Sequence, residues 1–581
     1  MLTEGRIASF IAENNLPFSL SKSLVDLIKA TCPNNSAENN MLHELKMSAT
    51  KCTNIIRQGL GFRFSKELID RLKVTKFSII PDETTDVSGD KQLAICVVYF
   101  DYEKFESVTS FFDMVNVHKC DSVSLYEAIK KCFEDKSIPL INIIGFSSDT
   151  CNVMFGETLS VVALMKSEFP NITFVKCNCH MIHLCMSHAC LKLSTSLEDL
   201  CRNVFNHFSR SSLRQHDLEE FQKFLDISPH KMLAPGQTRW LSLEACVARL
   251  LEQWDALVLY FTALVDEKRD PSYTTKSILK SLKNAFIKAQ LQFLQVQLRR
   301  ANEFNTMFQS NKPVLLYLHD QVKKLLKDIM SDFIQISCVR ECDPFTLDVY
   351  NTRYHVPISQ IYLGINATDT LSDSAVSKDR EGMTKFKKGC QEFLLELINQ
   401  IRRRFKTESF KILDFLIPEN ALNLKPSSLR NVFKSFPVLN DLFDKEEVDL
   451  EWRHLALHGG MMNGEDAAEF WKQQLSVKKI NGQMKYPNLS KVVGYCLALP
   501  NSNAAVERLF SHVRLIKTDV RNSLKSSSLN SLLHVKNGLK IAGISAHELI
   551  LDDRLKYAMS GVKSDATDDE CKNILKEKFR K

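Results

Sequence analysis

The spacing of apolar residues changes twice in the first part of the chain. From Leu2 to about Lys73 apolar side chains recur every three or four residues, as in amphipathic helices. Residues 76–117 instead hold three short apolar, β-branched runs separated by polar turns, which predicts three consecutive strands. Helix-like and strand-like segments then alternate up to a helix that begins near His180. This order predicts a mixed sheet with helices on its faces.

Helical spacing dominates the long stretch from 241 to 464, apart from a polar segment at 366–382 that predicts a loop. After Pro500 the pattern again predicts an amphipathic helix. Glu507 lies about 100° round from Val506, at the edge of the apolar stripe of that helix. A glutamate in this position is usually solvated, so a functional role requires other acids that meet it.

Composition is typical of a globular protein. The 581 residues are 44% hydrophobic and 25% charged, and this length allows about two to four domains. The 76 Lys and Arg against 69 Asp and Glu give a charge of +7, which permits nucleic-acid binding without requiring it. The sequence contains neither an apolar run long enough to span a bilayer nor a signal peptide at its start. We therefore expect no membrane partner and a cytosolic or nuclear location.

The 17 cysteines are an odd number spread through the chain, which indicates free thiols rather than a disulfide framework. Several Cys and His residues crowd into 177–190 and invite a zinc interpretation. Only side chains three or four residues apart share a helix face, and the sequence offers no second matching cluster and no Cys-x-x-Cys pair. We therefore expect no structural zinc.

Two acids stand at the ends of predicted strands. Asp82 ends the first strand and Asp149 ends the fourth. If these strands are neighbours, the two carboxylates emerge about 4.8 Å apart at one edge of the sheet. Such a pair can bind Mg²⁺, and Glu507 would add a third carboxylate for phosphodiester chemistry. The alternative is that both aspartates are turn formers at strand ends, and spacing alone favours this alternative.

Five segments occur in an order that resembles hAT-superfamily transposases and the host proteins descended from them. They are "FSIIPDETTDVSGDKQLAICVVYFD", "IIGFSSDTCNVMFG", "CNCHMIHL", "TRWLS" and "YPNLSKVVGYCLALPNSNAAVERLFS". The resemblance is closest to the BED-finger-associated animal branch and extends to about Gly538. It implies an α/β plus α fold, in which a large all-helical insertion interrupts a ribonuclease-H-like mixed sheet and a hAT-type dimerisation region follows.

The resemblance also assigns site residues. It implies that Asp82, Asp149 and Glu507 are a catalytic DDE triad that binds Mg²⁺ or Mn²⁺ if the protein is active. Asp86 is the nearest alternative to Asp82, but it lies four residues later, in the turn.

Three further residues match positions that contact DNA in this superfamily. His180 belongs to a Cys-x-x-His motif with Cys177, and it would lie near the acids and the DNA; a hydrogen-bonded core histidine is the alternative. Trp240 matches a tryptophan that stacks on an extruded base, although it can equally anchor the core where the insertion starts. Arg239 is placed to hold a phosphate.

Together these features divide the sequence into five predicted segments. They are a helical lead-in (1–73), the first part of the core (74–240), the helical insertion (241–464), the dimerisation region that completes the core (465–545) and a tail (546–581).

Self-association is predicted from the same C-terminal region. Leu529, Leu532 and Leu533 recur at helical spacing, and Leu539 joins them if the helix continues past Gly538. This apolar face is expected to join two or more copies, unless it packs inward.

Two functions remain open at this stage. The first is a domesticated nuclear protein that acts through dimerisation and through contacts to nucleic acid or protein. The second is an active transposase that hydrolyses a phosphodiester and then uses a 3′-hydroxyl for strand transfer. Related proteins commonly carry a BED zinc finger ahead of the helical lead-in, and this sequence begins at the lead-in, which favours the first.

Overall fold

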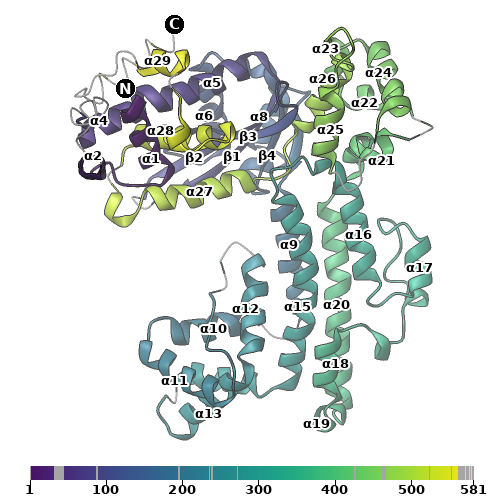
Figure 1. Ribbon diagram of the computed structural model, residues 1–581. Helices are drawn as coiled ribbons and strands as arrows, with labels where there is room; N and C mark the ends of the chain where they lie inside the picture. The colour runs from purple at the N-terminus through teal and green to yellow at the C-terminus, as the bar shows by residue number, and fades with distance from the viewer. Residues whose placement is uncertain are drawn as a thin grey trace. The chain divides into compact units, whose positions relative to one another are not determined.

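The computed structural model describes residues 2–31, 45–86, 89–193, 197–234, 236, 240–270, 272–423, 425, 427–460, 466–522, 524–550, 552–559, 570, 575 and 578. The chain forms two compact units, coloured by residue number in Figure 1. The sheet unit comprises Met1–Cys177, Gln309–Leu316 and Ile412–Lys581, and the helical unit comprises Asn178–Phe308 and Tyr317–Lys411. No described helix has both the length and the apolar composition that crossing a lipid bilayer requires.

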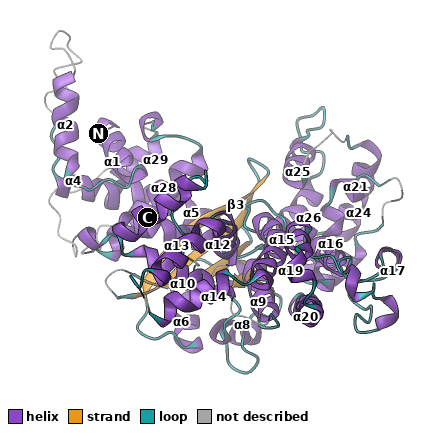
Figure 2. Ribbon diagram, turned by 90° about the horizontal axis from the view of Figure 1, so that it is seen from below, coloured by secondary structure: helices purple, strands orange, loops and turns teal. Residues whose placement is uncertain are grey.

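The sheet unit contains one five-stranded mixed sheet in the order β3-β2-β1-β4-β5. Its strands, orange in Figure 2, are β1 (Phe77–Thr85), β2 (Lys91–Asp101), β3 (Glu106–Asn116), β4 (Ile143–Ser148) and β5 (Thr173–Lys176). The first three strands pair antiparallel, whereas β4 runs parallel to both β1 and β5. This confirms the mixed sheet that the sequence pattern predicts.

Helices cover both faces of this sheet. The helices of the sheet unit include α1 (Leu2–Glu13), α2 (Leu20–Thr31), α4 (Ala49–Asn54), η1 (Ile55–Leu60), α5 (Gly61–Val74), α6 (Ser122–Glu134), α7 (Asn152–Phe155), α8 (Val161–Glu168), α21 (Pro418–Ala421), α22 (Arg430–Ser435), α23 (Leu439–Leu442), α24 (Lys445–His458), α25 (Ala467–Ser476), α26 (Pro487–Leu497), α27 (Ala504–Ile516), α28 (Ser526–Ala542) and α29 (Asp553–Met559). Side chains of a strand alternate between its faces: Ile79 packs with the α6 and α8 side, and Ile80 packs with α27 and α28. Both faces are therefore buried.

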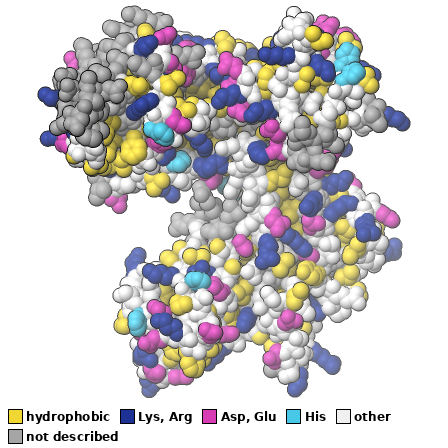
Figure 3. All heavy atoms as spheres, in the orientation of Figure 1, with side chains coloured by type: hydrophobic (Ala, Val, Ile, Leu, Met, Phe, Trp, Pro, Cys, Tyr) yellow, Lys and Arg dark blue, Asp and Glu magenta, His cyan; other side chains and the backbone are white. Residues whose placement is uncertain are grey.

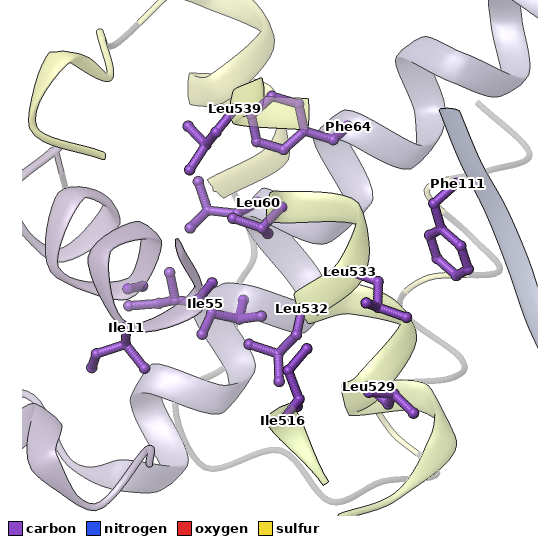
Figure 4. Packing of buried hydrophobic residues seen from close by; sticks show 14 of the residues in the cluster. Ile11, Ile55, Leu60, Phe64, Phe111, Ile516, Leu529, Leu532, Leu533 and Leu539 are labelled. Carbon is purple, nitrogen blue, oxygen red and sulfur yellow. The ribbon is translucent and has the colours of Figure 1, made fainter. Parts of the chain in front are cut away.

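The second face of the sheet is covered by helices from both ends of the sequence. Leu529, Leu532, Leu533 and Leu539 of α28 are each at most 3% exposed, and they pack with residues of α1, η1 and α5 (Figure 4). The helix does continue through Gly538, where a β-carbon would lie only 2.2 Å from the Phe64 ring. The prediction that this leucine face joins two copies is therefore wrong. It packs inward because the N-terminal helices cover it.

The helical unit contains no described strand. Its helices are α9 (Asn178–Cys190), α10 (Leu197–Ser209), α11 (Ser212–Phe224), α12 (Trp240–Glu252), α13 (Trp254–Asp266), α14 (Tyr273–Leu282), α15 (Ala285–Phe308), α16 (Leu318–Met330), α17 (Ile336–Glu341), α18 (Ile365–Ser372), α19 (Ser374–Ser377) and α20 (Arg380–Arg404). The polar segment 366–382 was predicted as a loop, but it forms α18, α19 and the start of α20. Ala367 and Leu371 are buried, and α18 packs on α15, so tertiary contact offsets the polar composition.

The boundaries of the two units differ from the boundaries of the predicted segments. The helical unit begins at Asn178 rather than at 241, because α9 packs along α15 and α20. Residues 412–464 belong to the sheet unit, although the predicted insertion includes them.

A buried histidine makes the stability of the sheet unit depend on pH. His534 of α28 is 8% exposed, its ring lies 4.9 Å from that of Phe111, and burial lowers its pKa to about 4. In the unfolded chain the histidine has a pKa of about 6.5, so on acidification it takes up a proton at a higher pH than in the folded chain. The free energy of unfolding therefore falls as the pH falls from about 6.5 through 4. At pH 5 this group alone should cost about 2 kcal/mol of unfolding free energy.

Urea denaturation at pH 7 and pH 5 measures this loss. His534→Gln should shrink the difference between the two pH values by about 2 kcal/mol. The exposed His547→Gln is the matched control and should leave the difference unchanged. An equal pH dependence in wild type and His534→Gln would contradict the assignment.

Candidate active site

The sheet places two predicted acids at the same level. Asp82 belongs to β1, and Asp149 directly follows β4, its parallel neighbour. Ile79 is paired with Phe146, and both aspartates lie three residues beyond this pair. Two parallel strands that advance equally keep these residues level with each other, so the two aspartates lie side by side, although β1 itself continues to Thr85.

The third acid comes from α27. This helix packs on β1 and β2 through buried residues that include Val506 and Val513, while Glu507 stays partly exposed at the margin of the buried stripe. Burial, then the Asp149 carboxylate, and to a smaller extent Glu507 and Glu83, raise the pKa of Asp82 to about 8. The carboxylates of Asp149 and Glu507 therefore both lie close enough to Asp82 to repel its charge.

The carboxylates of this site are chemically suited to bind a divalent cation. Carboxylate oxygens are the ligands that Mg²⁺ prefers, and a cation would relieve the repulsion that raises the pKa of Asp82. Within the described residues, no three His, Cys, Asp or Glu side chains are arranged to hold one metal ion together. Because Mg²⁺ commonly binds through one or two carboxylates and keeps several waters, Asp82 and Asp149 would hold the ion, with Glu507 beside them.

A hydrogen-bonded chain orients Asp82. Asn503, the residue before α27, donates from its side-chain amide to Oδ2 of Asp82 at 3.3 Å. Its side-chain oxygen accepts from the buried thiol of Cys177 at 2.7 Å. Oδ1 of Asp82 accepts the backbone N–H of Glu83 at 2.9 Å. Each carboxylate oxygen of Asp82 thus has one hydrogen-bond donor, Glu83 for Oδ1 and Asn503 for Oδ2, and Cys177 in turn orients Asn503.

Sequence reasoning missed Asn503. An asparagine before a helix normally caps it, but the Asn503 side chain makes no capping hydrogen bond to α27. The nearest sequence signal was the Cys177 motif, and that signal does not indicate a partner 326 residues away.

Asp86 has a different role from Asp82. Its Oδ2 lies 2.5 Å from Nζ of Lys517, and the two side chains are 1% and 6% exposed. Its Oδ1 accepts the backbone N–H of Asp90. Asp86 therefore joins the end of α27 to the turn between β1 and β2.

The predicted DNA-contact residues lie in the helical unit. His180 is half-buried on α9, with its ring 6.1 Å from that of His183. Trp240 begins α12, but its side chain lies outside the described residues, as does all of Arg239. On α9, Cys185 is buried, whereas the thiol of Cys179 faces the carbonyl of Asn305 at 3.8 Å.

Two family models match the sheet unit. Residues 13–158 match the ZMYM1/FAM200, RNase-like domain, and residues 439–539 match the hAT family C-terminal dimerisation region. Asp82 and Asp149 lie in the first match and Glu507 lies in the second. The site is therefore assembled from both matched regions.

A curated relative extends the similarity. General transcription factor II-I repeat domain-containing protein 2 from Bos taurus is 21% identical over 471 residues, which is 79% of this chain and 42% of the relative. The chain thus spans less than half the length of that protein.

Proposed function

From the premise that this chain combines an RNase-like domain with a hAT-type dimerisation region, both derived from hAT transposases, we propose that it is a domesticated nuclear protein. It acts by self-association and by contacts to nucleic acid or protein. The observation that carries the proposal is the match to the dimerisation region at 439–539. The Bos taurus relative supports a host role, because its name refers to a repeat domain of general transcription factor II-I.

Exposed leucines within 439–539 mark the surface for a second copy. Leu450 and Leu457 of α24 are 49% and 73% exposed, and their spacing of seven residues places them on one side of that helix. Leu442, just before α24, is also exposed. Exposed apolar side chains that recur on one helix face are typical of a contact surface.

Self-association is tested by light scattering at micromolar concentration. Wild type should show at least twice the chain mass of 66.4 kDa, and Leu450→Asp with Leu457→Asp should return it to one chain. Leu213→Asp, at an exposed leucine of the helical unit, is the control and should not change the mass. A monomeric wild type would refute the self-association.

The nuclear part of the proposal needs a separate measurement. A fluorescent fusion of the full chain should accumulate in the nucleus of cultured cells. A signal confined to the cytoplasm would contradict it.

The nearness of both Asp149 and Glu507 to Asp82 favours a second candidate, a metal-dependent DNA transposase. A bound divalent ion would supply the Lewis acid for phosphodiester hydrolysis and for attack by a 3′-hydroxyl. Asn503 would hold Asp82 in the orientation that the ion requires.

The second candidate predicts nicking of supercoiled DNA only when Mg²⁺ or Mn²⁺ is present. Asp149→Asn should reduce the rate by about a hundredfold or more, because it removes one carboxylate ligand of the ion. Asp135→Asn, at an exposed acid after α6, is the matched control and should keep wild-type activity. A folded, dimeric wild type without divalent-dependent nicking would leave the first proposal standing and reject this one.

A further inference from the structure

A cavity of about 440 Å³ lies in the sheet unit between α27, α28 and strands β2 and β3. Its apolar lining includes Cys96, Phe111 and Leu509. Four basic side chains complete it, Arg508 and His512 on α27 and Lys536 and Lys540 on α28. Each pair is four residues apart, so both members lie on the same side of their helix.

The basic side chains of the two helices lie close together. Burial, then Lys536, Lys540 and Arg508, lower the pKa of His512. The Arg508 guanidinium donates to the backbone carbonyl of Gln309 at 2.6 Å, and Lys536 donates to the Asn15 side chain at 3.0 Å. Like charges gathered in this way repel one another, and an anion would relieve the repulsion.

The side chains that line the cavity carry a net positive charge. Among its described residues, Glu13 is the one acid beside Arg508, Lys536 and Lys540, and a Glu13 oxygen accepts the backbone N–H of Ala546 at 3.1 Å. The visible side chains in Figure 3 show basic and acidic groups interspersed over the surface. The cavity therefore concentrates one sign of charge, unlike that mixed surface.

The cavity also adjoins the carboxylates of the candidate active site. Cys96 is paired with Ile80, two residues before Asp82 on the same side of β1. Burial raises the pKa of Cys96 to about 12, and Arg508 and Asp82 both affect this pKa, so both groups lie near Cys96. Arg508 itself follows Glu507 on α27.

We propose that this cavity binds one nucleotide of a single-stranded nucleic acid. Its phosphate contacts Lys536, Lys540 and Arg508, and its base lies against the apolar lining. Lys and Arg side chains are the usual partners of phosphate oxygens, and the volume is in the range of small-ligand pockets. A strand bound here continues along α27 toward the carboxylates. This inference rests on the nucleic-acid contact in the proposed function and assigns its place.

The test is fluorescence anisotropy of a fluorescein-labelled dT12 oligonucleotide with the full chain, in EDTA and about 100 mM salt. EDTA removes any contribution from metal at the carboxylates. Wild type should bind, and Lys536→Gln with Lys540→Gln should weaken binding by about tenfold, since two phosphate contacts are lost. The control is Lys478→Gln with Lys479→Gln, two exposed lysines whose loss changes the net charge equally.

A second variant keeps the test independent of folding. Lys540 is exposed, so Lys540→Glu should fold normally and still weaken dT12 binding more than Lys479→Glu does. If dT12 binds but the cavity and control variants weaken it equally, the cavity assignment fails and the nucleic-acid contact stands. If wild type does not bind dT12, the cavity assignment and the nucleic-acid contact both fail. If a labelled poly-glutamate peptide then binds in a way that depends on Lys536 and Lys540, the cavity is assigned to acidic protein partners instead. Light scattering of the same variants should still report self-association.

Discussion

Replacing Leu532 with Asp should unfold the sheet unit rather than separate two folded chains. Leu532 is 1% exposed and packs in one cluster with Ile11, Ile55 and Ile516 (Figure 4). The substitution removes a buried leucine, which typically costs about 2–5 kcal/mol, and it buries a carboxylate in an apolar site. Together, these two costs are comparable with the free energy of unfolding of a typical domain, about 5–15 kcal/mol.

Circular dichroism and the soluble yield measure this outcome. Leu532→Asp should lose the cooperative thermal transition of the sheet unit. Leu515→Asp is the matched control, because Leu515 is 61% exposed on α27 and its substitution should change stability by about 0.5 kcal/mol or less. A folded, monomeric Leu532→Asp protein would show instead that this face is an interface between copies.

Replacing Lys517 with Met should destabilise the protein by about 3–5 kcal/mol, because it leaves the Asp86 carboxylate buried without its cation. Both side chains are almost fully buried, and Nζ lies 2.5 Å from Oδ2. Removing both charges should recover much of the loss, because an apolar pair of similar volume requires no compensation. Lys517→Met with Asp86→Leu should therefore be more stable than Lys517→Met alone.

Urea denaturation of the two single variants and the double variant gives the coupling energy. The exposed ion pair between Lys312 and Asp466 is the control, and Lys312→Met should cost about 1 kcal/mol or less. If Lys517→Met were as mild as Lys312→Met, the ion pair would not hold α27 to the sheet.

The stability of this ion pair bears on the candidate site, because α27 carries Glu507. Lys517 closes the C-terminal end of α27 against the turn after β1, and Asn503 links its N-terminal end to Asp82. The helix is thus attached at its N-terminal end to β1 and at its C-terminal end to the turn that follows β1. Such attachments keep a carboxylate in position without contacting a ligand themselves.

Much of the sheet unit follows from local pattern. The β-branched runs at 76–117, with polar residues between them, predict three strands, and the structure has β1, β2 and β3 there. The same pattern placed Asp149 at the end of a strand, because a strand ends where apolar alternation gives way to polar residues, and Asp149 does directly follow β4. The prediction that Asp82 ends the first strand is wrong, because residues 83–85 continue to pair with β2 and β1 extends to Thr85. The order of motifs indicated the RNase-like domain and the dimerisation region that the family models match.

Other features depend on residues far apart in the chain. The leucine face of α28 is apolar whether a second copy or the N-terminal helices cover it, since burial stabilises either arrangement, and only the fold shows that α1, η1 and α5 do so. In the polar segment 366–382, α18 is helical because α15 supplies apolar contacts. Asn503 has the local pattern of a helix cap, but folding brings it to Asp82, 421 residues away in sequence. Sequence by itself thus determined the strands and the acids associated with them, because these depend on neighbouring residues. Tertiary structure alone decided what each buried face and each polar side chain contacts, because those partners are brought together only by the folded chain.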